Sequence, residues 1–165
     1  MRTQRASKVL ASVSSALLSL ACFAQTPAPQ FKSTCQPVGV PTQEPLGDRE
    51  GHALSVGDYS CVSQGGVLDG AVMSGTNIWE MDKGAGVTVT GNGVVRKPGA
   101  MVLYTVTEGS YTLTMADGKV TGFSGTAKGV YKLAAGAAAP LAGKSYTARF
   151  RSIERGQFVI ETTVD

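Results

Sequence analysis

From residue 51 onward the sequence repeats one unit, a short run rich in β-branched and aromatic residues that ends in a tight-turn signal. The turn signals include Asn92-Gly93 and Asp117-Gly118, and similar glycines occur in "MDKGAGV", "VTEGSY" and "IERGQF". This part of the chain shows no apolar stripe of helical period. The pattern predicts an all-β domain whose strands are joined mostly by hairpins. The expected strands are residues 52–63, 69–81, 86–96, 100–107, 110–116, 119–132, 144–151 and 157–164.

Apolar and polar residues alternate within these runs, so each expected strand has one apolar and one polar face. Tyr146 and Phe150 share one face and Arg149 lies on the other, while Tyr111 and Met115 share a face on an earlier strand. Consecutive antiparallel strands with one buried face predict a single eight-stranded closed barrel, because closure leaves no exposed edge. A β-sandwich is the alternative.

The first 24 residues have the pattern of a secretory signal peptide. Three basic residues precede the uncharged run "VLASVSSALLSLACFA", which is short for a bilayer span and ends in small residues. We expect cleavage after Ala24 and a periplasmic or secreted protein without a transmembrane segment in its mature chain. A lipid anchor on Cys22 is the alternative.

Removal of this segment changes the charge of the chain. The full sequence has 15 Lys and Arg against 12 Asp and Glu, and the signal peptide contains three of the basic residues and no acidic one. The mature chain is therefore neutral, which disfavours nucleic acid as a partner. Its 141 residues make one ordinary domain. The sequence has no phosphate-binding loop, nucleophile elbow or zinc-protease motif, so we expect no cofactor and no metal.

Residues 25–45 are rich in proline and predict an extended arm that precedes a barrel domain at residues 46–165. Cys35 lies in this arm, and Cys61 lies in the first expected strand. In an oxidising compartment these two cysteines are expected to form a disulfide that ties the arm to the strand. Two separate buried thiols are the alternative.

The stretch "LGDREGHALSVGDYSC" contains His52, the only histidine. Asp48, Glu50 and His52 alternate, so an extended backbone would point them the same way, as in a metal or acid–base site. Polar residues in the turn that leads into a strand are the simpler interpretation. His52 and Glu80 are the weak catalytic candidates, and Glu80 would enter the interior only if a bulge shifted its register.

The inward faces supply a candidate pocket. Trp79, the only tryptophan, would line a pocket or pack a filled core. Tyr104 and Tyr111 are expected to share a face across a turn at Glu108-Gly109, where they would orient a ligand or stack in the core. The expected ligand-binding residues are Trp79, Tyr104, Tyr111, Met115, Tyr146 and Phe150.

Three stretches carry a resemblance to a known group of proteins: "GHALSVGDYSC", "ADGKVTGFSGTA" and "PLAGKSYTARF". They resemble exported bacterial proteins that share the eight-stranded, calycin-like barrel of allene oxide cyclases and dirigent proteins. The resemblance covers residues 46–165 and implies an elongated apolar pocket, in which several such proteins cyclise or couple a small molecule. "AAGAAAPLAG" departs from their glycine-rich stretch, and none of their catalytic residues can be matched here. The resemblance therefore implies a fold more than a reaction.

The leading expectation is an exported barrel that binds a small apolar molecule in its cavity. A cofactor-free cyclase or isomerase would use the same cavity to fold a reactive substrate. The third possibility is a structural envelope protein with a packed barrel.

Overall fold

The computed structural model describes residues 30–165, so the expected signal peptide and Cys22 lie outside the described residues. These residues form eight strands and three short 3₁₀ turns, without an α-helix among them. They contain no helix of the length and apolar character that crossing a membrane requires. The strands are β1 (Phe31–Pro45), β2 (His52–Gln64), β3 (Val72–Asp82), β4 (Ala85–Lys97), β5 (Ala100–Ala116), β6 (Lys119–Gly136), β7 (Ser145–Ser152) and β8 (Phe158–Val164).

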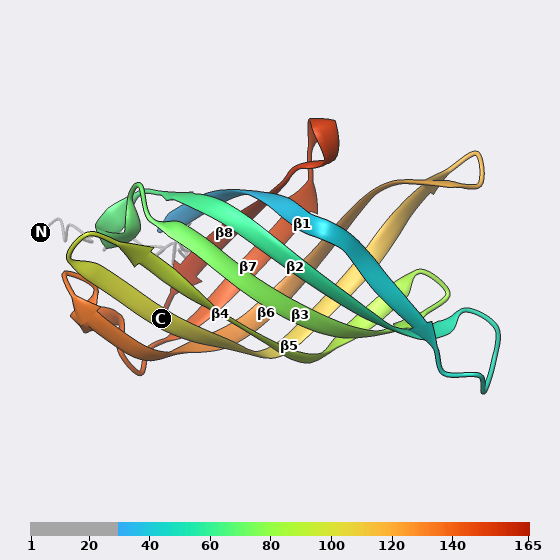
Figure 1. The fold of residues 1–165 in the computed structure, drawn as a ribbon, viewed down its shortest axis with the longest axis horizontal. Coiled ribbons are helices and arrows are strands. Elements are labelled where there is room, and N and C mark those ends of the chain that lie inside the picture. Colours follow the sequence, from blue (N-terminus) through green and yellow to red (C-terminus); the bar gives the residue numbers. More distant parts are fainter. Residues whose placement is uncertain (1–29) are drawn as a thin grey trace, which may run out of the picture.

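Each strand pairs antiparallel with the next in sequence, and β8 pairs back onto β1, which closes the sheet into a barrel (Figure 1). The prediction of an all-β fold with eight antiparallel strands is confirmed. Tight turns occur at three of the expected places, where positive φ angles are found at Lys83-Gly84, Asp117-Gly118 and Arg155-Gly156.

Two of the expected strand boundaries need correction. Residues 100–107 and 110–116 are one continuous strand, β5, because Glu108 and Gly109 are not a turn. Thr107 is instead an extra residue in the pairing of β5 with β6, which makes a β-bulge. The expected turn at Asn92-Gly93 is likewise absent, and both residues lie within β4.

The expected arm is also wrong, because residues 31–45 belong to the barrel as β1. This strand pairs with β2 over most of its length but with β8 only from Phe31 to Cys35. Three prolines lie in the half of β1 that has no neighbour on one side: Pro37, Pro41 and Pro45. Proline lacks an amide hydrogen, but on this free edge there is no second strand to which that hydrogen would have bonded. The total is still eight because β1 was not among the expected strands, while the expected strands 100–107 and 110–116 are the single strand β5.

The disulfide lies where β1 stops pairing with β8. Cys35 and Cys61 are directly opposite each other on β1 and β2, and their sulfur atoms are bonded. Cys35 is also the last β1 residue that is paired with β8. The bond therefore holds the first strand to its neighbour at the point where its other partner ends.

One end of the barrel is closed. The turns η1 (Gly66–Leu68) and η2 (Ala139–Leu141) lie together at this end, opposite the long hairpins (Figure 1). Leu68 and Leu141 are buried in the main core cluster together with Ala138. These apolar side chains fill the end of the barrel and separate its interior from solvent.

The wall is incomplete toward the opposite end. Beyond Cys35, β1 pairs only with β2, and β6 is paired with β7 only from Ser124 to Val130. The short strands β7 and β8 end between them at the turn η3 (Glu154–Gly156). We call this region, between residues 36–45 of β1 and residues 119–123 of β6, the side opening.

Candidate functional site

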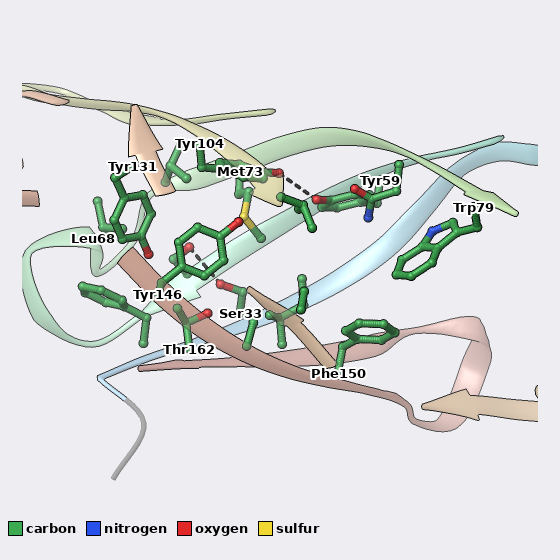
Figure 2. Close-up of a pocket in the computed structure, with 18 residues that line it drawn as sticks. Ser33, Tyr59, Leu68, Met73, Trp79, Tyr104, Tyr131, Tyr146, Phe150 and Thr162 are labelled. Carbon is green, nitrogen blue, oxygen red and sulfur yellow. Dashed lines mark hydrogen bonds between the residues drawn. The ribbon is translucent and has the colours of Figure 1, made fainter. Parts of the chain in front are cut away.

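The interior of the barrel contains two adjoining chambers. The inner chamber, toward the closed end, has a volume of about 70 Å³ and is drawn in Figure 2. The outer chamber, next to the side opening, has a volume of about 150 Å³. Five residues line both chambers and form what we call the neck between them: Tyr59, Asn77, Trp79, Phe150 and Ile160.

Aromatic rings make up much of the outer chamber. The ring of Trp79 lies 5.4 Å from that of Tyr111 and 5.9 Å from that of Phe150, measured between centroids. Phe123 and Phe158 are 5.5 Å apart. These spacings are those of tilted aromatic pairs, which present ring faces and edges to whatever occupies the chamber.

The outer chamber reaches the side opening. Pro37 and Pro41 line it from β1, and Phe123 lines it from β6, which are the two strands that border the missing wall. Asp58 is the one charged residue in its lining among the described residues, and its side chain is exposed. A molecule can therefore approach the aromatic surface from solvent at this end.

Neutral polar groups lie in and around the inner chamber. The hydroxyl groups of Tyr59 and Tyr104 are hydrogen-bonded to each other at 2.7 Å (Figure 2), and those of Ser33 and Ser63 at 3.0 Å. Among the described residues, no charged side chain lines this chamber. Four tyrosines line this chamber: Tyr59 of β2, Tyr104 of β5, Tyr131 of β6 and Tyr146 of β7.

Burial keeps these phenols protonated. Desolvation raises the pKa of Tyr59 and Tyr104 well above the ordinary value of tyrosine. The same cause raises the pKa of Tyr131 and of Tyr146. The interior therefore offers hydroxyl groups that donate and accept hydrogen bonds, without an ionised base.

Glycines inside the strands make room for the inward side chains. A Cβ atom at Gly75 would overlap the hydroxyl oxygens of both Tyr59 and Tyr104. Gly91 lies in the same way against the amide oxygen of Asn77. These glycines are in extended backbone, so close approach of a side chain, not a turn, explains them.

The structure brings four of the six expected ligand-binding residues to the inner chamber: Trp79, Tyr104, Tyr146 and Phe150. Tyr111 lines only the outer chamber. Met115 lines neither and is 55% exposed, because it lies next to the turn of the long β5–β6 hairpin, at the end away from η1 and η2 (Figure 1).

Sequence reasoning missed Tyr59, Asn77 and Tyr131, which also line the interior. Asn77 is two residues from Trp79 on β3, and Tyr59 is two residues from Cys61 on β2, so alternation would have placed both on the inner face. Asn77 lies within the expected strand 69–81, but its polar side chain was not expected in the lining of an apolar pocket.

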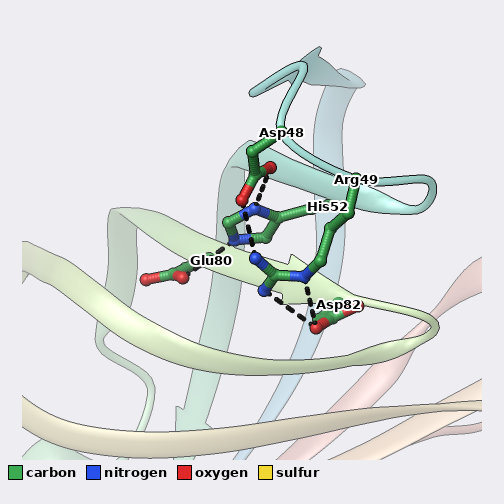
Figure 3. A network of polar contacts seen from close by, with 5 residues as sticks. All are labelled: Asp48, Arg49, His52, Glu80 and Asp82. Atoms are coloured by element: carbon green, nitrogen blue, oxygen red, sulfur yellow. Dashed lines mark hydrogen bonds and ion pairs between the residues drawn. The ribbon is translucent and has the colours of Figure 1, made fainter.

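His52 and Glu80 lie outside both chambers. His52 is only 7% exposed, and its Nδ1 atom lies 2.6 Å from Asp48 while its Nε2 atom lies 2.9 Å from Glu80 (Figure 3). Arg49 bridges Asp48 at 2.7 Å and Asp82 at 2.9 Å. These contacts fasten the β1–β2 hairpin to the end of β3.

The hydrogen bonds of this cluster shift the pKa values of His52 and Asp48. The hydrogen bond to Asp48, followed by that to Glu80, raises the pKa of His52. The hydrogen bond to His52 in turn lowers the pKa of Asp48. Both ring nitrogens are thus engaged by carboxylates, and residues 30–165 contain no set of side chains arranged to hold a metal ion. The cluster is suited to holding the hairpin in place.

A bulge does occur beside Trp79, but on the neighbouring strand. The pairing of β3 with β4 shifts between Ile78 and Trp79, and Val89 of β4 is the extra residue. The alternation of β3 is therefore undisturbed, so Trp79 points inward and Glu80 outward. Glu80 stays on the outer surface, where His52 binds it.

No family model matches this chain, and no curated protein or solved structure matches it either. The residues of the two chambers therefore carry the functional argument.

Proposed function

We propose that this protein is an exported barrel that binds a small, largely apolar molecule in its interior. The observation that carries the proposal is the pair of adjoining aromatic-lined chambers, of which the outer one reaches solvent at the side opening. Ligand sites are typically concave, mostly apolar and furnished with a few polar groups, and this interior has all three properties.

Export is supported by the bonded cysteines, because a disulfide of this kind persists in an oxidising compartment. A periplasmic or secreted location also agrees with the signal-like first 24 residues. The ligand would then be a molecule that is available outside the cytoplasm.

The proposal is tested by native mass spectrometry of the protein purified from its own host, before and after organic extraction. We expect a bound small molecule that extraction removes. Trp79→Ala should reduce the bound fraction about tenfold, the equivalent of about 1.4 kcal/mol of lost contact, since Trp79 lines both chambers. Met115→Ala is the matched control, because Met115 is exposed and lines neither chamber.

Retention of the ligand by Trp79→Ala, in a variant that unfolds like the wild type, would count against an interior site. The same mass spectrum reports the disulfide, because its formation removes two hydrogens. A protein without any bound molecule would favour the alternative of a structural barrel whose remaining interior space has no function.

A cyclase or isomerase of the allene oxide cyclase or dirigent type is a second proposal, since the same chambers would hold a reactive substrate in a folded shape. The observation in its favour is the buried pair of hydroxyl groups on Tyr59 and Tyr104. These groups are held in the neutral form, so they would orient a substrate or donate a hydrogen bond to it. His52 and Glu80 would not take part, because both lie outside the chambers.

A further inference from the structure

The outer face of the barrel carries neighbouring apolar side chains near the closed end. Val62 of β2 is directly opposite Val72 of β3. Leu103 of β5 is directly opposite both Val94 of β4 and Leu133 of β6. Residues paired in this way point to the same side of a sheet, so their side chains adjoin. We call this group the apolar band, and its members are Val62, Val72, Val94, Met101, Leu103 and Leu133.

Much of the apolar band is open to solvent. Val62 is 52% exposed, Val72 48%, Met101 51% and Leu133 62%. Val102, which follows Met101 on β5, is fully buried, so the band faces outward and is not part of the core. Adjoining exposed apolar side chains, unlike isolated ones, mark a surface that contacts a membrane or another protein.

Basic side chains adjoin the apolar band. Arg96 of β4 is directly opposite both Val72 and Met101, and Lys132 immediately precedes Leu133 on β6. Both cations are exposed, and neither forms an ion pair within residues 30–165. Cations beside an apolar surface match the edge of an anionic bilayer, where lipid phosphates lie next to acyl chains. This match favours lipid over a protein partner.

Charged side chains are distributed unevenly along the barrel axis, although the expected mature chain is neutral. Those at the closed end are Lys32, Arg96, Lys97, Lys132 and Lys144, against Asp69 and Asp165. The opposite end, at residues 44–50, 80–83, 117–119 and 154–155, has seven acidic side chains and four basic ones. A negatively charged surface would therefore attract the closed end and repel the other.

The chain also enters the barrel at the closed end, where β1 begins (Figure 1). Gln30 lies against Gly65, which precedes η1. With the expected cleavage after Ala24, only residues 25–29 separate the new amino group from Gln30, and this group adds a positive charge near the band. With a lipid on Cys22 instead, only residues 23–29 would lie between the anchor and Gln30. Both starts of the chain are compatible with this end lying against a membrane.

We infer that the closed end docks on an anionic lipid surface, with the apolar band against the bilayer interface and Arg96 and Lys132 beside lipid phosphates. The inference goes beyond the proposed function and does not depend on what the chambers hold. In this orientation the side opening lies at the end away from the lipid, so it faces the aqueous compartment.

The test measures cosedimentation of the mature chain, beginning at Gln25, with lipid vesicles. One set of vesicles is pure phosphatidylcholine, and the other contains phosphatidylcholine and phosphatidylglycerol in equal parts. We expect binding to the anionic vesicles to be at least about tenfold tighter and to weaken as salt is added, because salt screens the attraction.

Met101→Ser with Leu133→Ser removes two members of the apolar band. We expect this double variant to bind anionic vesicles at least about tenfold more weakly, since two apolar contacts with the interface are lost. Met115→Ser with Val120→Ser is the matched control, because these residues are 55% and 56% exposed and face each other on the same two strands at the opposite end. The control should bind like the wild type, and both variants should unfold at its temperature.

Arg96→Gln with Lys132→Gln tests the cations. Each cation near an anionic surface contributes about fivefold in affinity, so this variant should bind about twentyfold more weakly. Lys83→Gln with Lys119→Gln changes the net charge equally at the opposite end and should have little effect.

Absence of binding to the anionic vesicles would overturn the inference. Equal binding by the wild type and the Met101 and Leu133 variant would overturn it as well, because the association would then be electrostatic only. Light scattering distinguishes a further outcome. If the wild type binds no vesicles but forms a dimer that this variant abolishes, the band is an interface between copies of the chain, and lipid is not its partner.

Discussion

Gly75 shows how single residues shape the interior. It lies on β3 beneath the paired hydroxyl groups of Tyr59 and Tyr104, and any Cβ atom there would overlap both. Glycine is therefore required at this position because of what lies above it. The two hydroxyl groups can meet over β3 and β4 only because both strands have a glycine at that point, Gly75 and Gly93.

Gly75→Ala is expected to destabilise the protein by about 1–3 kcal/mol, the usual cost of overpacking a filled interior. The measurement is the free energy of unfolding in denaturant. Gly57→Ala is the matched control, because Gly57 also lies in extended backbone and a Cβ atom there meets nothing within 4 Å. The control should match the wild type or gain up to about 1 kcal/mol. Equal effects of the two substitutions would contradict the close approach.

Side-chain alternation predicted the direction of several inward residues, including Trp79, Tyr146 and Phe150. The prediction failed where one sequence pattern is compatible with two different structures. Asn92-Gly93 has the composition of a hairpin turn, yet Gly93 is a strand residue opposite Tyr104. A glycine that makes room for a distant side chain and a glycine that turns the chain look the same in one dimension.

His52 gives a residue-scale prediction on pH. Its pKa is raised by Asp48 and then Glu80, so the stability it contributes is complete below its ordinary pKa of 6.5 and is lost as pH rises through the raised value. The pKa of Asp48 is lowered from 3.8, so its contribution is present above 3.8 and is lost as pH falls through the lowered value. The hairpin contact is strongest between these limits.

The single histidine gives one set of imidazole signals, so its titration can be followed by NMR without assignment. We expect a pKa above 6.5 in the wild type and a decrease toward that value in Asp48→Asn. Glu50→Gln is the control, because Glu50 lies in the same turn but does not contact the imidazole. An unchanged titration in Asp48→Asn would show that the pair does not form in solution.

At the scale of the element, β1 is the strand that the sequence concealed. Its prolines are typical of an irregular arm. They are compatible with a strand only because the pairing of β1 with β8 ends at Cys35, which leaves the proline-containing half with a free edge. The length of β8 cannot be known from the composition of β1. The all-β class, the antiparallel order and three of the turns were predictable. The total of eight agreed only because the missed strand β1 offset the division of β5 into two expected strands.

The disulfide matters most to β1, because half of that strand has one neighbour. Cys35 and Cys61 are separated by 26 residues, and closing a loop of that size stabilises the folded state by about 3 kcal/mol in the chain-entropy model. The double substitution Cys35→Ala with Cys61→Ala should therefore lower the free energy of unfolding by about that amount. Denaturant unfolding with and without reductant checks it, and the double variant itself should be insensitive to reductant.

At the scale of the whole molecule, the barrel has two unlike ends. At the closed end β1 pairs with both β2 and β8 and the leucines of η1 and η2 are buried, whereas at the other end residues 36–45 of β1 and 119–123 of β6 pair on one side only. Local stability follows the number of partners that each backbone segment has. We therefore expect local stability to decrease along the barrel axis, from the closed end to the opposite end.

Amide hydrogen exchange measures this gradient. Residues 36–45 of β1 and 119–123 of β6 should exchange faster than residues 31–35 and 124–130 of the same strands, because the former lack one neighbour. Comparison within one strand keeps the sequence context similar. Uniform protection along both strands would show that the side opening is covered in solution.

The side opening also bears on how quickly a guest enters and leaves. A barrel that is sealed at both ends must move a loop or separate two hydrogen-bonded strands to exchange its contents, a local opening on the scale of microseconds to seconds. Here a small molecule meets a route bordered by Pro37, Pro41 and Phe123, where β8 does not pair with β1 and β7 does not pair with β6. Loading would then proceed at the rate of diffusive encounter, and the residence time would depend on the contacts made inside. Differences in affinity among guests would accordingly be differences in their rates of escape.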